Sequence, residues 1–248
     1  MNMKYLVVAV IVIVVAVTGA ILALRIIKPS GPSFSELFAL ASNSTYTANY
    51  NYYIYSDMAG QVSTEDYLLT YSQSGLTDRY IIVTTTTAPQ TSLYIVTTRL
   101  GNGTLIQCVA ESLYSGCTPI NQTFNLIYLM LPTVNSSSFT FIGTQKMLGY
   151  NAYCYVSRNT TLLGNLVPSA AQYGLGSLPV NVTSEVCVSN DGVPLLIRLS
   201  AYTTLSISGY LAQFNITQLL RATKVQDGVY LSSNATALLK ALGINGTG

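Results

Sequence analysis

Apolar and polar residues alternate along much of the chain after residue 45, which is the period-two pattern of strands with one buried face. These runs are rich in Val, Ile, Thr and Tyr, and compact turns such as Gly101-Asn102-Gly103 separate them. We therefore expect an antiparallel meander of about five strands in the first half of the domain. Its predicted strands are 45–57, 62–72, 79–87, 92–99 and 104–110.

The alternation returns in the second half of the chain. The pattern predicts strands over 139–143 and 146–157, and a hairpin of 180–189 with 193–206 around Asn190-Asp191-Gly192. A stretch rich in Gly, Pro and Ala, 164–179, separates the two groups. The fold class is therefore α+β and mainly β, with an antiparallel sheet and a few short helices.

Helical spacing of apolar residues occurs at three places. Ser33 and Glu36 have the spacing of a capping box, and a short amphipathic helix is predicted behind them. A second helix is expected before Pro132, and a third over 233–242, where Ser233 is the cap and Gly243 the stop. The apolar positions of the first two are Phe34, Leu37, Phe38 and Ala41, and Phe124, Ile127, Tyr128 and Leu131.

The N-terminus carries an apolar segment. Tyr5–Leu24 is twenty residues without a charge, and at about 1.5 Å rise per residue it spans roughly 30 Å, the thickness of a bilayer core. A cleaved signal peptide is the alternative, although its apolar stretch is usually about 7 to 15 residues long. We expect a transmembrane anchor over 1–28, a linker over 29–33 and an extracytoplasmic β-rich domain over 34–248.

Nine asparagines begin an N-x-S/T triplet without proline, well above what this content of Asn, Ser and Thr would give by chance. N-glycosylation at these sites requires export of everything after the anchor. The chain is therefore predicted to be a single-pass cell-membrane glycoprotein whose C-terminal domain lies outside the cell. The predicted sites are Asn43, Asn102, Asn121, Asn135, Asn159, Asn181, Asn215, Asn234 and Asn245.

All four cysteines follow the apolar segment: Cys108, Cys117, Cys154 and Cys187. An even number in an exported domain indicates two disulfides, for which three connectivities exist. The favoured one joins the first pair, which is close in sequence, and the second pair, whose members each lie in a strand-like run. A zinc site is disfavoured because no C-x-x-C pair and no histidine is present.

Composition narrows the function further. Charged residues make up only 8% of the chain, and the net charge is +2 with no run of like charge, so no nucleic-acid partner is expected. Without histidine, Ser-His-Asp and Cys-His catalysis are impossible. Glu65 and Asp66 are adjacent in a predicted strand, so their side chains point to opposite faces. The chain is predicted not to be an enzyme and to carry no cofactor or metal.

The later strands resemble the lipoprotein-carrier superfamily, the LolA and LppX-like proteins. The resemblance rests on a glycine followed by alternating aromatics and on a strand–turn–strand with Asp-Gly and Pro-Leu, at Gly149, Tyr150, Tyr153, Tyr155, Asp191, Gly192, Pro194 and Leu195. It implies a strongly curved, half-barrel-like sheet around an apolar cavity that is closed by helices and holds acyl chains. The chain lacks the family's lipobox, and no ligand-binding residue carries over.

Tyrosine is concentrated in 45–57, a run that strand alternation divides between two faces. One face looks like a core or cavity wall, with ordinary sheet packing as the alternative to an aromatic binding site. Tyrosine suits this place because it buries apolar area while its hydroxyl remains hydrogen-bonded. The candidate wall residues are Tyr46, Tyr50, Tyr52 and Ile54.

Two hypotheses about function follow, which belong to different classes of protein. One is a membrane-anchored binding protein that holds a lipid or another hydrophobic ligand in its β-domain. The other is a structural or accessory subunit of a surface layer, filament or membrane complex with surface-protein partners. The scarcity of charge, the disulfides and the sequons also suggest the surface of an acid-living archaeon, since hydroxyls, amides and glycans still solubilise where carboxylates protonate.

Overall fold

The computed structural model describes residues 31–58, 60–111, 114–123, 125–131, 135–207, 210–231, 236–237 and 240. The chain divides into two compact units, Met1–Gly31 and Pro32–Gly248, and the description below concerns the second. Among the described residues, no helix has both the length and the apolar character needed to cross a membrane. The anchor predicted over 1–28 lies outside them, and so does the helix predicted over 233–242, apart from residues 236, 237 and 240.

The domain is mainly β, as the alternation predicts. Eleven strands of the described residues form one open antiparallel sheet in the order β6-β5-β4-β3-β2-β1-β11-β10-β9-β8-β7. Their bounds are β1 Tyr46–Met58, β2 Gln61–Ser74, β3 Asp78–Thr85, β4 Ser92–Arg99, β5 Leu105–Glu111, β6 Tyr114–Pro119, β7 Thr140–Met147, β8 Tyr150–Leu162, β9 Pro179–Ser189, β10 Pro194–Ile207 and β11 Tyr210–Asp227.

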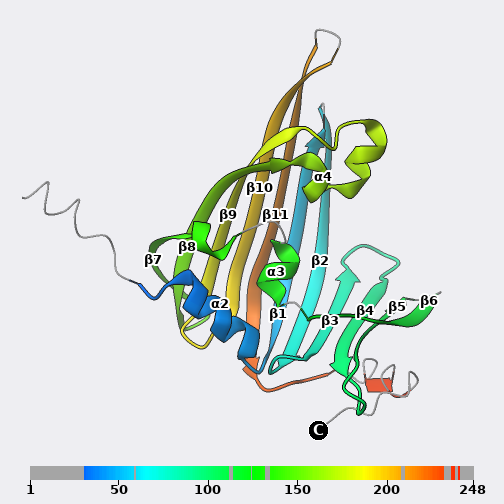
Figure 1. The fold of residues 1–248 in the computed structure, drawn as a ribbon, viewed down its shortest axis with the longest axis vertical. Coiled ribbons are helices and arrows are strands. Elements are labelled where there is room, and N and C mark those ends of the chain that lie inside the picture. The colour runs from blue at the N-terminus through cyan, green and yellow to red at the C-terminus, as the bar shows by residue number, and fades with distance from the viewer. Residues whose placement is uncertain are drawn as a thin grey trace, which may run out of the picture. The chain divides into compact units, whose positions relative to one another are not determined.

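The sheet consists of two meanders that meet at its centre. The chain runs outward from β1 to the edge strand β6, crosses over, and returns from the opposite edge strand β7 to β11, which pairs with β1. The crossover carries α3 (Leu126–Met130) and the 3₁₀ turn η1 (Ser136–Ser138) in front of the sheet (Figure 1). The crossover therefore covers one face of the sheet.

The other helices lie on the same face (Figure 1). They are α2 (Phe34–Asn43), α4 (Leu163–Leu166) and the 3₁₀ helix η2 (Pro168–Tyr173). The predicted capping box is present at the start of α2, where the Ser33 hydroxyl accepts from the Glu36 N–H and the Glu36 carboxylate accepts from the Ser33 N–H. This helix buries the predicted stripe of Phe34, Leu37 and Ala41 in the main core.

The main core lies between these helices and the sheet. Tyr46 and Tyr50 of β1 and Tyr71 of β2 belong to it, and each is at most 2% exposed. The Tyr50 hydroxyl donates to the Pro194 carbonyl over 2.9 Å, which satisfies a polar group in an apolar place. Tyr50 thus serves as a large core residue with a hydrogen-bonded hydroxyl, whereas the buried Tyr46 hydroxyl has no partner among the described residues.

A smaller core lies on the opposite face of the sheet. Tyr80 and Val96 pack there with Cys108, and Val229 and Leu231, from the segment after β11, cover them. The Thr47 hydroxyl fastens this segment, since it donates to the Gly228 carbonyl and accepts from the Tyr230 N–H. The cover is a short polypeptide segment rather than a helix.

Both disulfides join residues that lie directly opposite each other on neighbouring strands. Cys108 of β5 pairs with Cys117 of β6, and Cys154 of β8 pairs with Cys187 of β9. This is the favoured connectivity of the three that the sequence left open. No free cysteine is found in the part of the chain that the structure describes.

The prediction placed one turn wrongly. The sequence divided 139–157 at residues 144–145, but β7 and β8 run to Met147 and from Tyr150, which pair directly. The turn residues Leu148 and Gly149 both have positive φ, 53° and 86°. This is typical of the two-residue hairpin turns whose twist matches that of the strands. A leucine in that conformation is uncommon, so a turn at Leu148 was not expected from residue type.

Five elements were not predicted: β6, η1, α4, η2 and β11. The edge strand β6 follows β5, η2 with the adjoining α4 occupies most of the Gly/Pro/Ala-rich stretch, and β11 is the longest strand, with 18 residues. The predicted helix before Pro132 is present but short, because it begins only at Leu126, where the Asn125 side chain accepts from the Tyr128 N–H.

Candidate functional site

A row of polar side chains crosses the helix-covered face from β2 to β6. Consecutive members lie directly opposite each other on neighbouring strands. Gln73 and Arg79 show which face this is, because their side chains donate to the carbonyls of Ala41 and Ser42 in α2. The members are Gln73, Arg79, Thr97, Gln107 and Thr118.

An apolar row runs beside it on the same face. Each of its members is two residues away from a polar one along its own strand, so both rows point to the same side. Tyr71 is fully buried, whereas Ile81, Ile95 and Val109 are only half-buried. The pairing of Tyr71 with Ile81, of Ile81 with Ile95 and of Ile95 with Val109 makes the row continuous.

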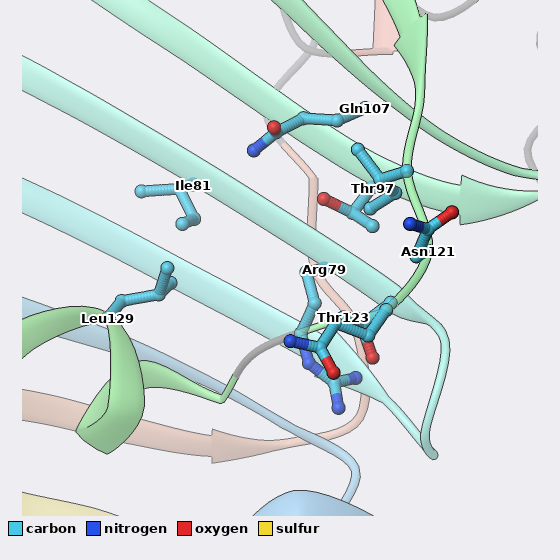
Figure 2. A pocket seen from close by; sticks show the side chains of 9 residues that line it. Arg79, Ile81, Thr97, Gln107, Asn121, Thr123 and Leu129 are labelled. Atoms are coloured by element: carbon cyan, nitrogen blue, oxygen red, sulfur yellow. The ribbon is translucent and has the colours of Figure 1, made fainter. Parts of the chain in front are cut away.

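A cavity of about 260 Å³ lies where the two rows meet the crossover. Figure 2 shows Arg79, Thr97 and Gln107 of the polar row and Ile81 of the apolar row on its sheet side. The opposite wall comes from residues 120–123 and from Leu129 of α3. The cavity therefore has a polar end and an apolar side.

Hydrogen bonds fasten the cover of this cavity to the rest of the domain. The Thr123 hydroxyl donates to the Leu76 carbonyl in the β2–β3 turn over 2.6 Å. The buried Asn125 side chain donates to the Ser42 hydroxyl over 2.8 Å and also caps α3. The 120–129 segment that faces the cavity is thereby held near its middle, at residues 123 and 125.

Arg79 is the charged group of the cavity, and it is only 3% exposed. Its two Nη atoms donate to four backbone carbonyls, those of Gly75, Leu76 and Asp78 and that of Ser42 in α2. Its Nε is buried without a hydrogen-bond partner. Within the described residues the one ion pair is Arg198 with Glu185, so no carboxylate neutralises Arg79.

A second cavity, of about 240 Å³, lies on the other side of α3 and also touches α2 and η1. Its lining is largely apolar and aromatic, and the rings of Phe34 and Phe139 stack with centroids 4.0 Å apart. Leu129 faces the first cavity, whereas Ile127 and Tyr128 face the second. The second is lined by Phe34, Phe38, Ile127, Tyr128, Leu131, Asn135 and Phe139.

Comparison with known proteins leaves the family open. No protein-family model matches the chain, and no curated protein does. Among solved structures, a DUF1329 family protein from Desulfovibrio piger covers 87% of this chain and 100% of its own, with 10% identity and a TM-score of 0.33. A putative outer membrane lipoprotein-sorting protein domain from Vibrio parahaemolyticus covers 84% and 97%, with 11% identity and a TM-score of 0.34.

A LolA superfamily protein from Nitrosomonas europaea covers 82% of this chain and 97% of its own, with 11% identity and a TM-score of 0.32. Its name comes from the superfamily that the later strands of the sequence resemble. All three TM-scores lie below 0.5, so we base no conclusion about this chain on them.

None of the four candidate wall residues lines either of the two cavities described above. Tyr46 and Tyr50 are buried in the core, Tyr52 is half-buried and packs against Tyr67 with ring centroids 5.9 Å apart, and Ile54 is half-buried. Neither cavity has any of the four in its lining. The two cavities are lined instead by residues of β3 to β5, of the crossover and of α2.

Burial governs the electrostatics of the tyrosines. Desolvation raises the pKa of Tyr46, Tyr50 and Tyr71 well above its usual value. Desolvation also raises the pKa of Tyr52 to about 12, with smaller contributions from the neighbouring Tyr67 and Glu65. These phenols therefore stay neutral across the physiological range. The hydroxyls of Tyr50 and Tyr71 donate to the Pro194 carbonyl and the Gln73 side chain, whereas the buried Tyr46 hydroxyl has no hydrogen-bond partner among the described residues.

The predicted glycosylation sites are distributed over both faces. Asn121 lies in the lining of the first cavity and Asn135 in that of the second. Asn43, Asn102, Asn121, Asn135 and Asn181 are exposed, and Asn159 and Asn215 are half-buried. Asn234 and Asn245 lie outside the described residues.

No group of three or more His, Cys, Asp or Glu side chains that could hold a metal ion occurs in the part of the chain that the structure describes. Glu65 and Asp66 follow each other in β2, and the Glu65 carboxylate accepts from the Tyr67 hydroxyl.

Arg79 was not identified from the sequence, although a signal for it exists. In β3 it alternates with Ile81 and Val83, so strand periodicity places a cation on the same face as two apolar side chains. In a chain with 8% charged residues, such a position is unusual. Gln107 follows the same rule in β5, where it alternates with Leu105 and Val109.

Proposed function

We propose that this chain is a membrane-anchored binding protein of the outer cell surface that holds a lipid or another hydrophobic ligand on the helix-covered face of its sheet. The observation that carries the proposal is the cavity between β3 to β5 and the crossover, whose apolar side continues into the half-buried Ile95 and Val109. Binding of an apolar chain over exposed apolar surface of this kind is favourable, because it removes that surface from water.

The placement of the helices supports this function. The helices α2, α3, α4 and η2 all contribute to the main core on one face of a single sheet, which is the side that a half-barrel closed by helices would cover. The cavity, at about 260 Å³, lies just below the range of roughly 300–1,000 Å³ typical of small-molecule pockets. It therefore suits one end of a ligand, with the remainder lying along the apolar row.

A second candidate function is a structural or accessory subunit of a surface assembly. Its support is the pair of edge strands, β6 and β7, which lie at the two ends of the open sheet. Edge strands present unpaired backbone groups that another chain can join by adding a strand. In this function the helix-covered face would hold no ligand.

Native mass spectrometry of the full chain, extracted from the membranes of its own cells, separates the two functions. A binding protein carries co-purifying acyl lipid on the monomer. A scaffold appears as a stable assembly whose subunits are free of lipid. Finding monomers that never carry lipid, even after incubation with a membrane lipid extract, would refute the proposed binding function.

The location also belongs to the proposal. In this proposal an anchor over residues 1–28 would hold the domain outside the cell, and occupied sequons would follow from that location. Glycopeptide mass spectrometry tests this, with occupancy of exposed sites such as Asn102 and Asn181 as the expected result. Bare asparagines at all nine sites would contradict the glycoprotein assignment. The acid-living archaeal surface remains a proposal that rests on composition.

A further inference from the structure

We infer that the Arg79 cavity selects amphiphiles with an anionic head, namely a carboxylate or a phosphate monoester carried on an aliphatic chain. This inference deepens the binding function proposed above and rests on it. It concerns the class of ligand: the proposed function requires only an apolar ligand, whereas the charge of the cavity requires an anionic one.

The first step is the charge of Arg79. A guanidinium is protonated at every physiological pH, and removing it from water is unfavourable unless an opposite charge or a full set of acceptors compensates. Arg79 is 3% exposed, and among the described residues its partners are neutral carbonyls. An oxyanion in the cavity would supply the missing opposite charge.

The second step is the donor that remains available. Four of the five guanidinium N–H groups are used by backbone carbonyls, which fix the plane of the group. The fifth, on Nε, has no partner although it is buried. A buried donor without an acceptor is uncommon and calls for a missing partner. An anionic oxygen is the strongest acceptor for it.

The third step is the neighbourhood of that donor. Thr97 lies directly opposite Arg79, and Gln107 directly opposite Thr97, and both side chains line the cavity. Neither side chain donates to another group within the described residues. A hydroxyl and an amide can donate to the further oxygens of a carboxylate or phosphate, so the polar row provides more than one contact for the head.

The fourth step is the course of the chain. Ile81 lines the cavity next to Arg79, and Ile95 and Val109 continue the apolar row across two more strands. With neighbouring strands about 4.8 Å apart, the three residues span roughly 10 Å. An aliphatic chain that leaves the head would follow this row over half-buried side chains.

Equilibrium binding to the full-length chain in a non-ionic amphipol tests the inference. The probes are radiolabelled palmitate, hexadecyl phosphate and hexadecanol, which share one chain length and differ in head charge, measured at pH 8, where the carboxylate is ionised. We expect the two anionic probes to bind at least about tenfold more tightly than hexadecanol, because hydrogen bonds to a charged group in a buried site are stronger than those to a neutral hydroxyl.

The outcomes separate the two levels of the proposal. Equal affinity for hexadecanol and palmitate would overturn the anionic head but leave the binding function intact. Absence of binding by all three probes would overturn the binding function itself. Inorganic phosphate serves as a competitor. If it displaces palmitate as strongly as hexadecyl phosphate does, the cavity binds a free oxyanion, and the inference that it selects an amphiphile is refuted.

Variants locate the selectivity. Arg79→Gln is expected to bring the palmitate-to-hexadecanol preference close to one, while the matched Arg198→Gln, at an exposed ion pair, leaves it unchanged. Because Arg79 also holds four carbonyls, Gln107→Leu provides a second variant that retains them, and it should weaken palmitate several-fold and spare hexadecanol. A folded Arg79→Gln variant, or a Gln107→Leu variant, with the full preference would overturn the inference.

Discussion

The Ser44 hydroxyl donates a hydrogen bond of 2.7 Å to the Asp191 carbonyl, 147 residues away in the chain. This contact docks the β9–β10 turn on the C-terminal end of α2. Gly192, the next residue, has a φ of +85°, and a Cβ on it would lie 2.5 Å from Ser44 Oγ and 2.8 Å from the Ala41 nitrogen. The close approach of turn and helix therefore requires a residue without a side chain.

Gly192→Ala is expected to destabilise the domain by about 1–2 kcal/mol for the left-handed backbone, plus about 1–3 kcal/mol for pushing the helix off the turn. Gly60→Ala is the matched control, because Gly60 has the same φ of +85° and nothing within 4 Å of the added Cβ. Urea unfolding followed by tyrosine fluorescence compares the two. Equal losses of stability in the Gly192→Ala and Gly60→Ala variants would contradict the close contact between Gly192 and α2.

The central strand β11 shows where local sequence fails to determine the element. Its segment Gln218 to Lys224 contains Leu, Arg, Ala and Lys, which favour helices, and it lacks clean alternation. Pairing with β1 on one side and β10 on the other makes it a strand. A bulge at the Asn49–Tyr50 position of the β1 pairing also interrupts its periodicity. Long-range pairing overrides propensity here, and only tertiary structure reveals it.

The candidate site was predictable in kind but not in residues. Alternation divided the tyrosines of β1 between two faces and placed Tyr46 and Tyr50 together on the one that forms the core, and the capping box correctly placed α2. The cavity, however, forms where the crossover passes over β3 to β5, which depends on β7 starting at the far edge of the sheet. Local periodicity does not determine the order of strands in a sheet. The sequence alone therefore could not show that Asn121 and Leu129 line the same cavity as Arg79.

The buried tyrosines predict alkaline sensitivity. Their folded pKa values are raised above the unfolded value of about 10. The stabilisation of the neutral phenols is therefore fully present below about pH 10 and is lost as pH rises toward about 12, the value of Tyr52. We expect tyrosinate absorbance to rise in two phases, the second of which coincides with loss of the near-ultraviolet circular dichroism.

The control is the same titration in concentrated denaturant, where all tyrosines should ionise in one phase near pH 10. Tyr52→Phe should retain the fold to a higher pH, because one of the groups that must ionise is removed. A folded protein that ionises every tyrosine in a single phase near pH 10 would show that the rings are not buried.

The two disulfides should differ in their contribution to stability. They close loops with sequence separations of 9 and 33 residues. In the loop-entropy model the corresponding stabilisations are about 2.6 and about 3.7 kcal/mol. The double variant Cys154→Ser/Cys187→Ser is therefore expected to lose about 1 kcal/mol more than Cys108→Ser/Cys117→Ser in urea unfolding. A larger loss of stability in Cys108→Ser/Cys117→Ser would mean that local packing around the disulfides outweighs the entropy of loop closure.

Acid should affect this fold little, because few of its contacts depend on carboxylates. The whole chain has nine Asp and Glu residues, and the described part has a single ion pair, Arg198 with Glu185, whose side chains are 46% and 22% exposed. Exposed pairs contribute about 0–1 kcal/mol. The core side chains that donate buried hydrogen bonds, such as Tyr50, do not titrate in acid.

Glu36 is the carboxylate for which a clear acid effect is expected. Hydrogen bonds from the Ser33 backbone and side chain lower the pKa of Glu36, so its contribution is present above its usual pKa and lost as pH falls below it. From pH 7 to pH 2, near-ultraviolet circular dichroism should therefore show a retained fold, and far-ultraviolet circular dichroism should show a slightly weaker α2. Glu36→Gln, which preserves the capping-box spacing without a titrating group, should remove that pH dependence. Cooperative unfolding near pH 3 would refute both the acid tolerance and the acidic habitat proposed from the composition.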